Sequence, residues 1–209
     1  MTATVPVMEA VLRRVADTLI ERSAELDELD AALAGGDHGR NLAAVARRLR
    51  ERAPALAALP LPEALAAVAE LLEREGSGAA AHYYAVFLAA MAPLVPVEPK
   101  RAADLLPGFE AGMLALERAG AAPPGGKSLV DVLHALQRAL AWYGEGTDRE
   151  RVEARLMAAA GHAMHQTRYR EAKWEPAAGL GPRSIEHMDA GACSAALILG
   201  AVLDALDAR

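Results

Sequence analysis

Long runs of alanine and leucine, each closed by glycine or proline, restrict most strongly how this chain can fold. Within each run apolar residues recur three or four positions apart, as Met8, Val11 and Leu12 do, which is the spacing of one face of an α-helix. Hydrophobic residues make up 53% of the chain and aromatic residues only 4%, so the excess lies in alanine and leucine, the strongest helix formers. The sequence therefore predicts an all-α fold.

Glycines and prolines divide the chain into its expected helices. The turn at residues 76–78 separates two of them, and Pro54 and Pro60 are expected to end a third. A kink is expected near Pro107. The expected helices span residues 6–25 with a stripe continuing to 33, then 41–52, 61–75, 79–91, 100–119, 129–143, 148–169 and 189–207, with a further break at 144–146.

Length, charge and cysteine content limit the class of protein. The 209 residues are predicted to form one domain, 1–209. A net charge of −6 argues against duplex nucleic acid as a partner, and the single cysteine, Cys193, excludes an internal disulfide and a cysteine-rich zinc site. Residues 1–11 lack the pattern of a signal peptide, and no apolar run is expected to span a bilayer. We therefore expect a cytoplasmic protein without a membrane partner.

The loops between the expected helices indicate where a ligand site could form. Roughly eight helices with short connections are typical of an antiparallel bundle or a closed helical barrel. In an up-down arrangement every second loop falls at the same end. The glycine-rich loops at 34–39, 76–79, 121–127 and 174–188 are therefore expected to form one site at one end of the bundle.

The richest of these loops for chemistry is Gly35-Gly36-Asp37-His38-Gly39. Asp37 could cap the following helix or hold a hard cation, and the capping role is the more common one for an aspartate before a helix. Asp30 lies about two helical turns earlier and can join Asp37 only if the intervening loop folds over. The stretch offers two carboxylates, one imidazole and free backbone N–H groups in a small neighbourhood.

Four motifs in order give the chain a family resemblance. They are Asp30 followed by Gly-Asp-His-Gly, a Gly-Ser-Gly turn leading to Tyr83 and Phe87, Gly-Lys-Ser-Leu-Val-Asp, and Leu-Gly-Pro-Arg-Ser-Ile-Glu-His-Met-Asp-Ala-Gly-Ala from residue 180. In this the chain resembles the DhaL family, the nucleotide-binding subunit or domain of dihydroxyacetone (glycerone) kinases. The resemblance covers nearly the whole chain.

The resemblance implies an eight-helix barrel that holds ADP or ATP with Mg²⁺ at one end. It implies phosphotransfer to a small triose or polyol that is carried by a separate dihydroxyacetone-binding kinase subunit. A phosphotransferase-system protein or a transcriptional regulator is the alternative partner. The metal ligands would be Asp30 and Asp37, and the nucleotide contacts would come from His38, Asn41, Ser77, Gly78, Lys127, Arg183 and Asp189.

Several positions depart from the family pattern. The middle aspartate of its metal motif falls on Gly35, the phosphate-binding hydroxyl on Ala79, a second aspartate on Gly126 and an arginine on Pro176. Each departure removes a charged or hydrogen-bonding group. They support an alternative function, a non-catalytic binding or regulatory module that has lost metal or nucleotide ligands.

Other candidate sites have weaker support from the sequence. Lys127-Ser128 resembles the end of a P-loop, but position 121 is alanine and no strand precedes it. His162 and His165 could bind a metal at their helical spacing, but no third ligand is evident, so a surface pair is expected. Cys193 is expected to be a packed core thiol.

Overall fold

In the computed structural model, residues 4–142 and 148–208 are described, and within these ranges the chain forms helices and loops without a strand, which confirms the all-α prediction. Tyr143 and the break predicted at 144–146 lie outside the described residues. The α-helices are α1 (Thr4–Glu21), α2 (Ser23–Ala31), α3 (His38–Ala57), α4 (Leu61–Glu75), α5 (Gly78–Met91), α6 (Leu106–Arg118), α7 (Leu129–Leu140), α8 (Arg149–Gln166) and α9 (Ala190–Asp207). The 3₁₀ helices are η1 (Ala92–Leu94), η2 (Ala102–Leu105), η3 (Thr167–Tyr169) and η4 (Ala177–Ser184).

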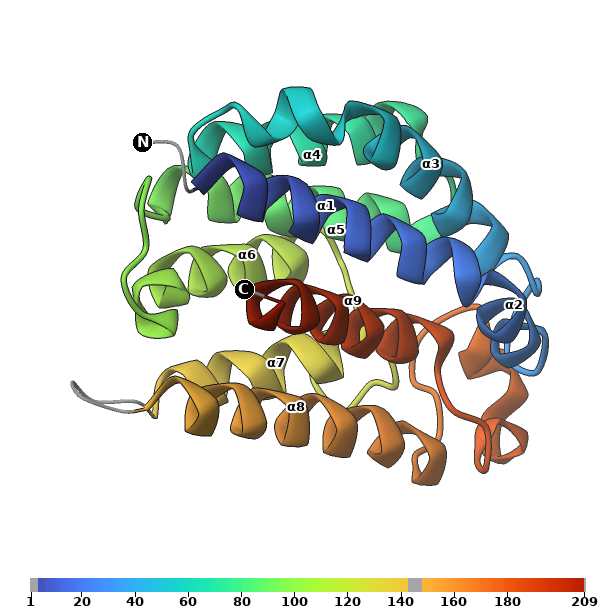
Figure 1. The fold of residues 1–209 in the computed structure, drawn as a ribbon. Coiled ribbons are helices and arrows are strands. Elements are labelled where there is room, and N and C mark those ends of the chain that lie inside the picture. Colours follow the sequence, from blue (N-terminus) through green and yellow to red (C-terminus); the bar gives the residue numbers. More distant parts are fainter. Residues whose placement is uncertain (1–3, 143–147, 209) are drawn as a thin grey trace.

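Among the described residues, α1 and the seven helices α3 to α9 close into a ring in chain order. Each packs against the next, and α9 returns to pack against α1 (Figure 1). Successive helices of the ring alternate in direction, and the short α2 lies across one end, against α3 and α9. The predicted eight-helix antiparallel barrel is confirmed.

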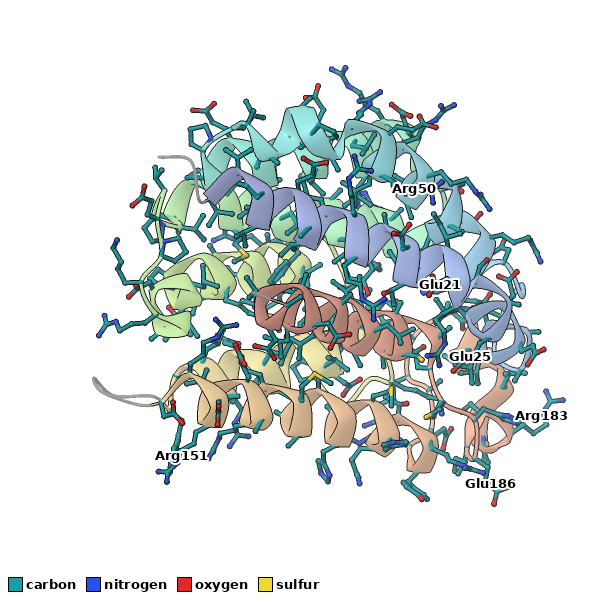
Figure 2. All side chains as sticks on the ribbon, viewed as in Figure 1. Glu21, Glu25, Arg50, Arg151, Arg183 and Glu186 are labelled. Atoms are coloured by element: carbon teal, nitrogen blue, oxygen red, sulfur yellow. The ribbon has the colours of Figure 1, made fainter. Side chains whose placement is uncertain are left out.

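Alternating directions place the glycine-rich loops together. The loops after α2, α4, α6 and α8 all lie at one end of the ring, which we call the loop end, while α1 begins and α9 finishes at the other end (Figure 1). The labelled side chains of Glu25, Arg183 and Glu186 lie at the loop end, and Arg151 lies at the opposite end (Figure 2). As predicted, α3, α5, α7 and α9 therefore all begin at the loop end.

Small residues allow the helices of the ring to pack closely. In α6, Gly112 is buried against α5, and a Cβ atom added to it would lie 2.5 Å from a ring carbon of Phe87. That ring also packs edge-on against Phe109, with centroids 4.9 Å apart. Glycine at position 112 is thus needed for the contact between α5 and α6.

We expect Gly112→Ala to destabilise the fold by about 1 to 3 kcal/mol, because the added methyl group overpacks the contact with Phe87. Gly161→Ala is the matched control, since Gly161 is also helical but its added Cβ would meet nothing within 4 Å. It should stabilise the fold by about 0.5 to 1 kcal/mol through helix propensity alone. Urea unfolding of both variants tests the pair, and equal effects would contradict the packing role of Gly112.

The first two predicted helices have different ends in the structure. The first expected helix breaks at Arg22, where α1 ends and α2 turns across the ring, which allows Leu26 to become fully buried. Pro54 does not end α3 but lies in its last turns. The missing N–H costs one helical hydrogen bond, while continuation of the helix buries Leu56 and Ala57.

The segment 100–119 and the predicted helix 148–169 also differ from expectation. Residues 102–105 form η2, so Pro107 lies in the first turn of α6, where proline is tolerated, instead of kinking a longer helix. Residues 167–169 form the separate helix η3 after α8.

Helix α9 corrects the expectation that no segment could span a bilayer. Its 18 residues are long and apolar enough by length and composition. In the structure, however, α9 is a member of the ring, and it packs against α1, α7 and α8. Residues 190–195 at its start are buried, including Cys193, as predicted for a core thiol.

Candidate functional site

The loop between α2 and α3 folds back, as the two predicted metal ligands require. The backbone N–H of Asp37 donates a hydrogen bond to Asp30 Oδ2 at 3.0 Å. Gly36 allows this turn with a φ of 71°, a conformation that favours glycine. Asp30 is partly buried, whereas the Asp37 carboxylate is exposed and forms no hydrogen bond or ion pair within the described part of the chain. The loop therefore places the Asp37 carboxylate beside Asp30 and leaves it available to bind a ligand.

The capping role considered for Asp37 is wrong, because Asp27 performs it. Asp27 Oδ1 accepts hydrogen bonds from the N–H groups of Gly39 at 2.8 Å and Arg40 at 3.0 Å. Its Oδ2 accepts one from the Arg40 guanidinium at 2.8 Å. Asp27 belongs to α2, so no motif around the start of α3 could reveal it. Its contacts stabilise the helix start and leave the Asp37 carboxylate free.

Gly39 is the point at which α3 starts directly against α2. A Cβ atom at this position would lie far inside the van der Waals contact distance of the Ser23 carbonyl oxygen. The glycine is buried, and the close approach of the two helices determines where Asp37 and His38 lie. Glycine at position 39 is thus needed for α2 and α3 to pack against each other.

His38 connects the loop to a buried chain of hydroxyl groups. Its Nε2 lies 3.0 Å from Ser194 Oγ, which lies 2.8 Å from the hydroxyl oxygen of Tyr84. Ser194 Oγ also lies 2.9 Å from the Gly191 carbonyl oxygen, and a Ser194 proton donated there requires His38 Nε2–H to be the donor to Ser194. Burial lowers the pKa of His38, although Asp30, Asp27 and Asp37 oppose this shift. The ring is therefore held neutral, with a defined orientation.

Three further predicted contacts lie where α3 and α5 begin. Ser77 Oγ donates a hydrogen bond to Asn41 Oδ1 at 2.9 Å. Gly78 has a φ of 78°, and a Cβ atom there would lie 3.0 Å from Asn41 Nδ2. The Ser77 hydroxyl accepts no hydrogen bond from the first N–H groups of α5 and so does not cap this helix. The N-terminus of α5 thus keeps its positive end without a side-chain cap, unlike α7 and α9, which Ser128 and Asp189 cap.

Lys127 is buried, and its ammonium group is used within the chain. Its Nζ donates to the carbonyl oxygens of Thr167, Arg170, Ser184 and His187 at 2.5 to 3.2 Å. Burial lowers the pKa of Lys127. The side chain therefore fastens the segment from η3 to α9, and in this structure its donors point at backbone oxygens.

Asp131 fastens the neighbouring turn. Its Oδ1 accepts hydrogen bonds from the N–H of Gly125 at 2.6 Å and from Arg170 at 2.8 Å. Its Oδ2 accepts one from the Ser128 N–H at 2.9 Å. Together Lys127 and Asp131 hold the loops after α6 and α8 in place at the loop end.

The last two predicted contact residues, Arg183 and Asp189, differ in their surroundings. Arg183 is exposed and extends into solvent at the loop end (Figure 2). The Asp189 carboxylate accepts a hydrogen bond from the Ala192 N–H at 2.6 Å as the cap of α9. Burial raises the pKa of Asp189 to about 7; the Ala192 hydrogen bond and Lys127 oppose this shift, while Asp131 and Asp30 add to it. Asp189 is thus electrostatically coupled to the site, whereas Arg183 stands apart.

We expect Asp189→Asn to flatten the pH dependence of stability. The raised pKa of Asp189 means that the folded state binds an extra proton between about pH 4 and 7, so stability falls as pH rises through this range. The asparagine keeps an oxygen for the Ala192 N–H. From pH 5 to pH 8 the free energy of unfolding of the variant should therefore rise by on the order of 2 kcal/mol relative to that of the wild type.

Urea unfolding at pH 5 and pH 8 measures this gain. The lowered pKa of His38 acts in the opposite sense, since stability is lost as pH falls below the ordinary pKa of histidine, but it acts equally in both proteins. Parallel profiles for the two proteins would contradict a raised pKa at Asp189.

The donor set limits how a metal could be held. Within the described ranges no group of three or more His, Cys, Asp or Glu side chains is arranged around a common point, and His162 and His165 are exposed on α8. Magnesium is commonly held by one or two carboxylates together with phosphate oxygens and water. Asp30 and Asp37 therefore fit one magnesium ion shared with a phosphate ligand, and they do not form a cage made by protein alone.

Comparisons with known proteins agree with the motifs. A family model described as the DAK2 domain matches residues 32–204. Triokinase/FMN cyclase of Homo sapiens is 33% identical over 208 residues, covering 95% of this chain and 35% of that protein. The ADP-binding subunit DhaL of PEP-dependent dihydroxyacetone kinase 1 of Listeria innocua is 30% identical over 178 residues, 85% of each chain.

Solved structures share the fold. The dihydroxyacetone kinase of C. freundii aligns in its native form with a TM-score of 0.73 at 19% identity, and in complex with AMP-PNP and Mg²⁺ with a TM-score of 0.72 at 20% identity. The chain covers only 34% of that kinase and 35% of the human triokinase/FMN cyclase. At this level of identity the structural match shows the architecture alone.

Proposed function

The chain belongs to the DAK2 domain family, and from this we propose that its loop end binds an adenine nucleotide, ADP or ATP, together with magnesium. The nucleotide would serve phosphotransfer to a small triose or polyol, as in dihydroxyacetone kinases. The observation that carries the proposal is the carboxylate of Asp37, which is exposed and uncommitted beside Asp30.

The electrostatics of the loop end suit a phosphate ligand. Helices α3, α5, α7 and α9 all direct their N-termini, the positive ends of their dipoles, to this end. The start of α5 has no side-chain cap, so its first N–H groups are proposed to donate hydrogen bonds to phosphate oxygens. Two carboxylates beside such a site attract a cation that neutralises the phosphates.

The proposed roles of the residues follow from their contacts. Asp30 and Asp37 would hold one magnesium ion, which when bound neutralises and orients phosphate oxygens. His38 would be neutral and would add no positive charge to the site. Its hydrogen bond with Ser194 would hold in place the loop that contains Asp37. Asn41 and Ser77 keep the start of α5 next to the start of α3.

We propose that the sugar is presented by a separate dihydroxyacetone-binding subunit or domain. The support is the relative from Listeria innocua, whose name describes a subunit that binds ADP. The cytoplasm is the proposed location. A phosphotransferase-system protein or a regulator remains the alternative partner, and an acidic chain with a pI near 5.5 gives no reason to propose nucleic acid.

Thermal unfolding with ADP, with magnesium chloride and with both tests the proposal. A ligand at 100 times its dissociation constant stabilises the folded state by about 2.7 kcal/mol. The expected result is a rise in the melting temperature that needs nucleotide and magnesium together. No rise at millimolar concentrations of both would contradict nucleotide binding.

Gly126 favours a second candidate, a non-catalytic binding or regulatory module. A Cβ atom at position 126 would lie 2.8 Å from the Pro123 carbonyl oxygen, so this turn excludes the aspartate of the family pattern. Gly126 is also buried. Losing such a charged contact commonly costs about 1.5 to 3 kcal/mol of ligand binding.

Gly35→Asp distinguishes the two candidates, because position 35 has room for the missing carboxylate. A Cβ atom there would lie 3.8 Å from the Asp37 carboxylate carbon, in ordinary contact. In a nucleotide-binding protein the variant should raise the affinity for magnesium–ADP about tenfold, through one added charged ligand. Calorimetric titration measures the gain.

Gly35→Asn is the matched control for that gain, since it has the same shape without the charge. An affinity that does not change in Gly35→Asp, with wild-type binding weak or undetectable, would favour the non-catalytic module. Without magnesium, Gly35→Asp should be slightly less stable than wild type, because two carboxylates then face each other.

A further inference from the structure

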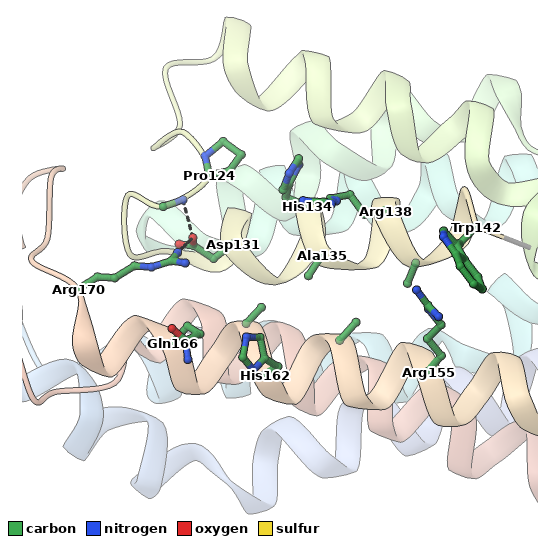
Figure 3. Close-up of a pocket in the computed structure, with 14 residues that line it drawn as sticks. Pro124, Asp131, His134, Ala135, Arg138, Trp142, Arg155, His162, Gln166 and Arg170 are labelled. Atoms are coloured by element: carbon green, nitrogen blue, oxygen red, sulfur yellow. Dashed lines mark hydrogen bonds and ion pairs between the residues drawn. The ribbon is translucent and has the colours of Figure 1, made fainter.

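A groove of about 590 Å³ runs along the side of the ring, between α7 and α8. It begins beside Pro124 at the loop end and reaches Trp142 near the opposite end (Figure 3). None of the residues proposed to contact nucleotide or metal lines it. The groove is therefore separate from the proposed site.

Short side chains form the floor of the groove. Ala135 and Ala139 of α7 lie beside Ala159 and Ala163 of α8. In the described part of the chain, α8 packs mainly against α7, α9 and the short η3, so its outer side is not covered by another helix of the ring. A shallow channel floored by alanine between two adjacent helices is the shape that receives the side-chain ridge of a third helix.

Three arginines line the rim of the groove, Arg138, Arg155 and Arg170. The imidazoles of His134 and His162 lie between them as further polar groups. Asp131 is the single carboxylate among the described lining residues, and Arg170 with two backbone N–H groups already binds it. The groove is thus a positive stripe on a chain whose net charge is −6.

The arrangement of these cations favours an elongated ligand. In Figure 3 the labelled side chains from Arg170 to Arg155 are spread along the length of α7 and do not converge on one point. The groove is also open to solvent, whereas a small-molecule site encloses most of its ligand. A row of carboxylates on a helix matches such a stripe better than one phosphate does.

Trp142 provides a hydrophobic anchor at one end. Its side chain is 71% exposed, and the Arg155 guanidinium carbon lies 4.2 Å from the centre of its ring. Tryptophan and arginine are the residues most enriched among those that dominate protein–protein binding. An exposed indole that is already oriented by an arginine can be covered with little loss of conformational freedom.

We propose that the α7–α8 groove is a docking surface for an acidic amphipathic helix of a partner protein. The helix would place a stripe of apolar residues over the four alanines and its carboxylates against Arg138, Arg155 and the histidines. An acidic pI near 5.5 argues against a nucleic acid as the occupant.

A labelled peptide tests the surface directly. The probe is a fluorescein-labelled helical peptide of 18 residues with leucines along one stripe and glutamates on both sides of it. Fluorescence anisotropy with the full chain should show saturable binding, and the double variant Arg138→Glu, Arg155→Glu should weaken it about tenfold or more. Trp142→Ala should weaken it as well.

Two controls separate docking from general charge attraction. Arg47→Glu changes an exposed arginine on α3, across the ring from α7, and should leave binding unchanged. The same peptide with glutamine in place of glutamate should bind at least tenfold more weakly. Equal binding to all variants, or displacement by an oligonucleotide as effective as displacement by unlabelled peptide, would overturn the proposal.

Discussion

Replacing Gly39 with alanine should destabilise the protein by about 3 kcal/mol or more, although alanine normally favours a helix. The added Cβ would lie far inside the contact distance of the Ser23 carbonyl oxygen. The neighbouring atoms are backbone and not the flexible end of a side chain. Either α2 must move away from α3, or the first turn of α3 must unwind.

Gly35→Ala is the control in the same loop, because the nearest atoms to its Cβ would be those of the Asp37 carboxylate, in ordinary contact at 3.8 Å. The free energy of unfolding of Gly35→Ala should remain within about 1 kcal/mol of that of the wild type. Urea unfolding measures both free energies. A Gly39→Ala protein as stable as Gly35→Ala would show that α2 and α3 are not in contact at this point.

Replacing Asp37 with asparagine should reduce the affinity for magnesium–ADP about tenfold to a hundredfold, because a charged ligand of the metal is lost. The fold should be unaffected. The side chain is exposed and accepts no hydrogen bond from the described residues, so the free energy of unfolding should change by less than about 0.5 kcal/mol.

Asp27→Asn is the matched variant, because Asp27 has the structural contacts that Asp37 lacks. It should lower stability by about 1 kcal/mol through the weakened cap of α3, yet keep the dependence of nucleotide binding on magnesium. If both variants lost stability and affinity to the same extent, Asp37 would have no separate role in metal binding.

The architecture could be predicted because it depends on regular patterns. The spacing of apolar residues gave the helices, and alternating directions put the glycine-rich loops at one end. Boundaries were less predictable where tertiary burial overrode local signals. Leu26 becomes buried because the chain bends at Arg22, and Pro54 is tolerated because the helix beyond it packs into the core.

The candidate site could be predicted only in part, for a similar reason. Asp30, Asp37, His38, Asn41, Ser77 and Gly78 were found from motifs, and the structure brings Asp30 against Asp37 and Asn41 against Ser77 and Gly78. Asp27 was missed because its partners belong to another helix. The four carbonyl contacts of Lys127 depend on how a distant loop folds, which no local motif records.

Calorimetric titration of the wild-type protein with ADP, with and without magnesium, tests nucleotide binding most directly. We expect one site per chain, binding that requires magnesium, and strong weakening by Asp37→Asn. Absence of measurable heat with millimolar nucleotide and magnesium, in a protein whose unfolding is cooperative, would contradict nucleotide binding at the loop end.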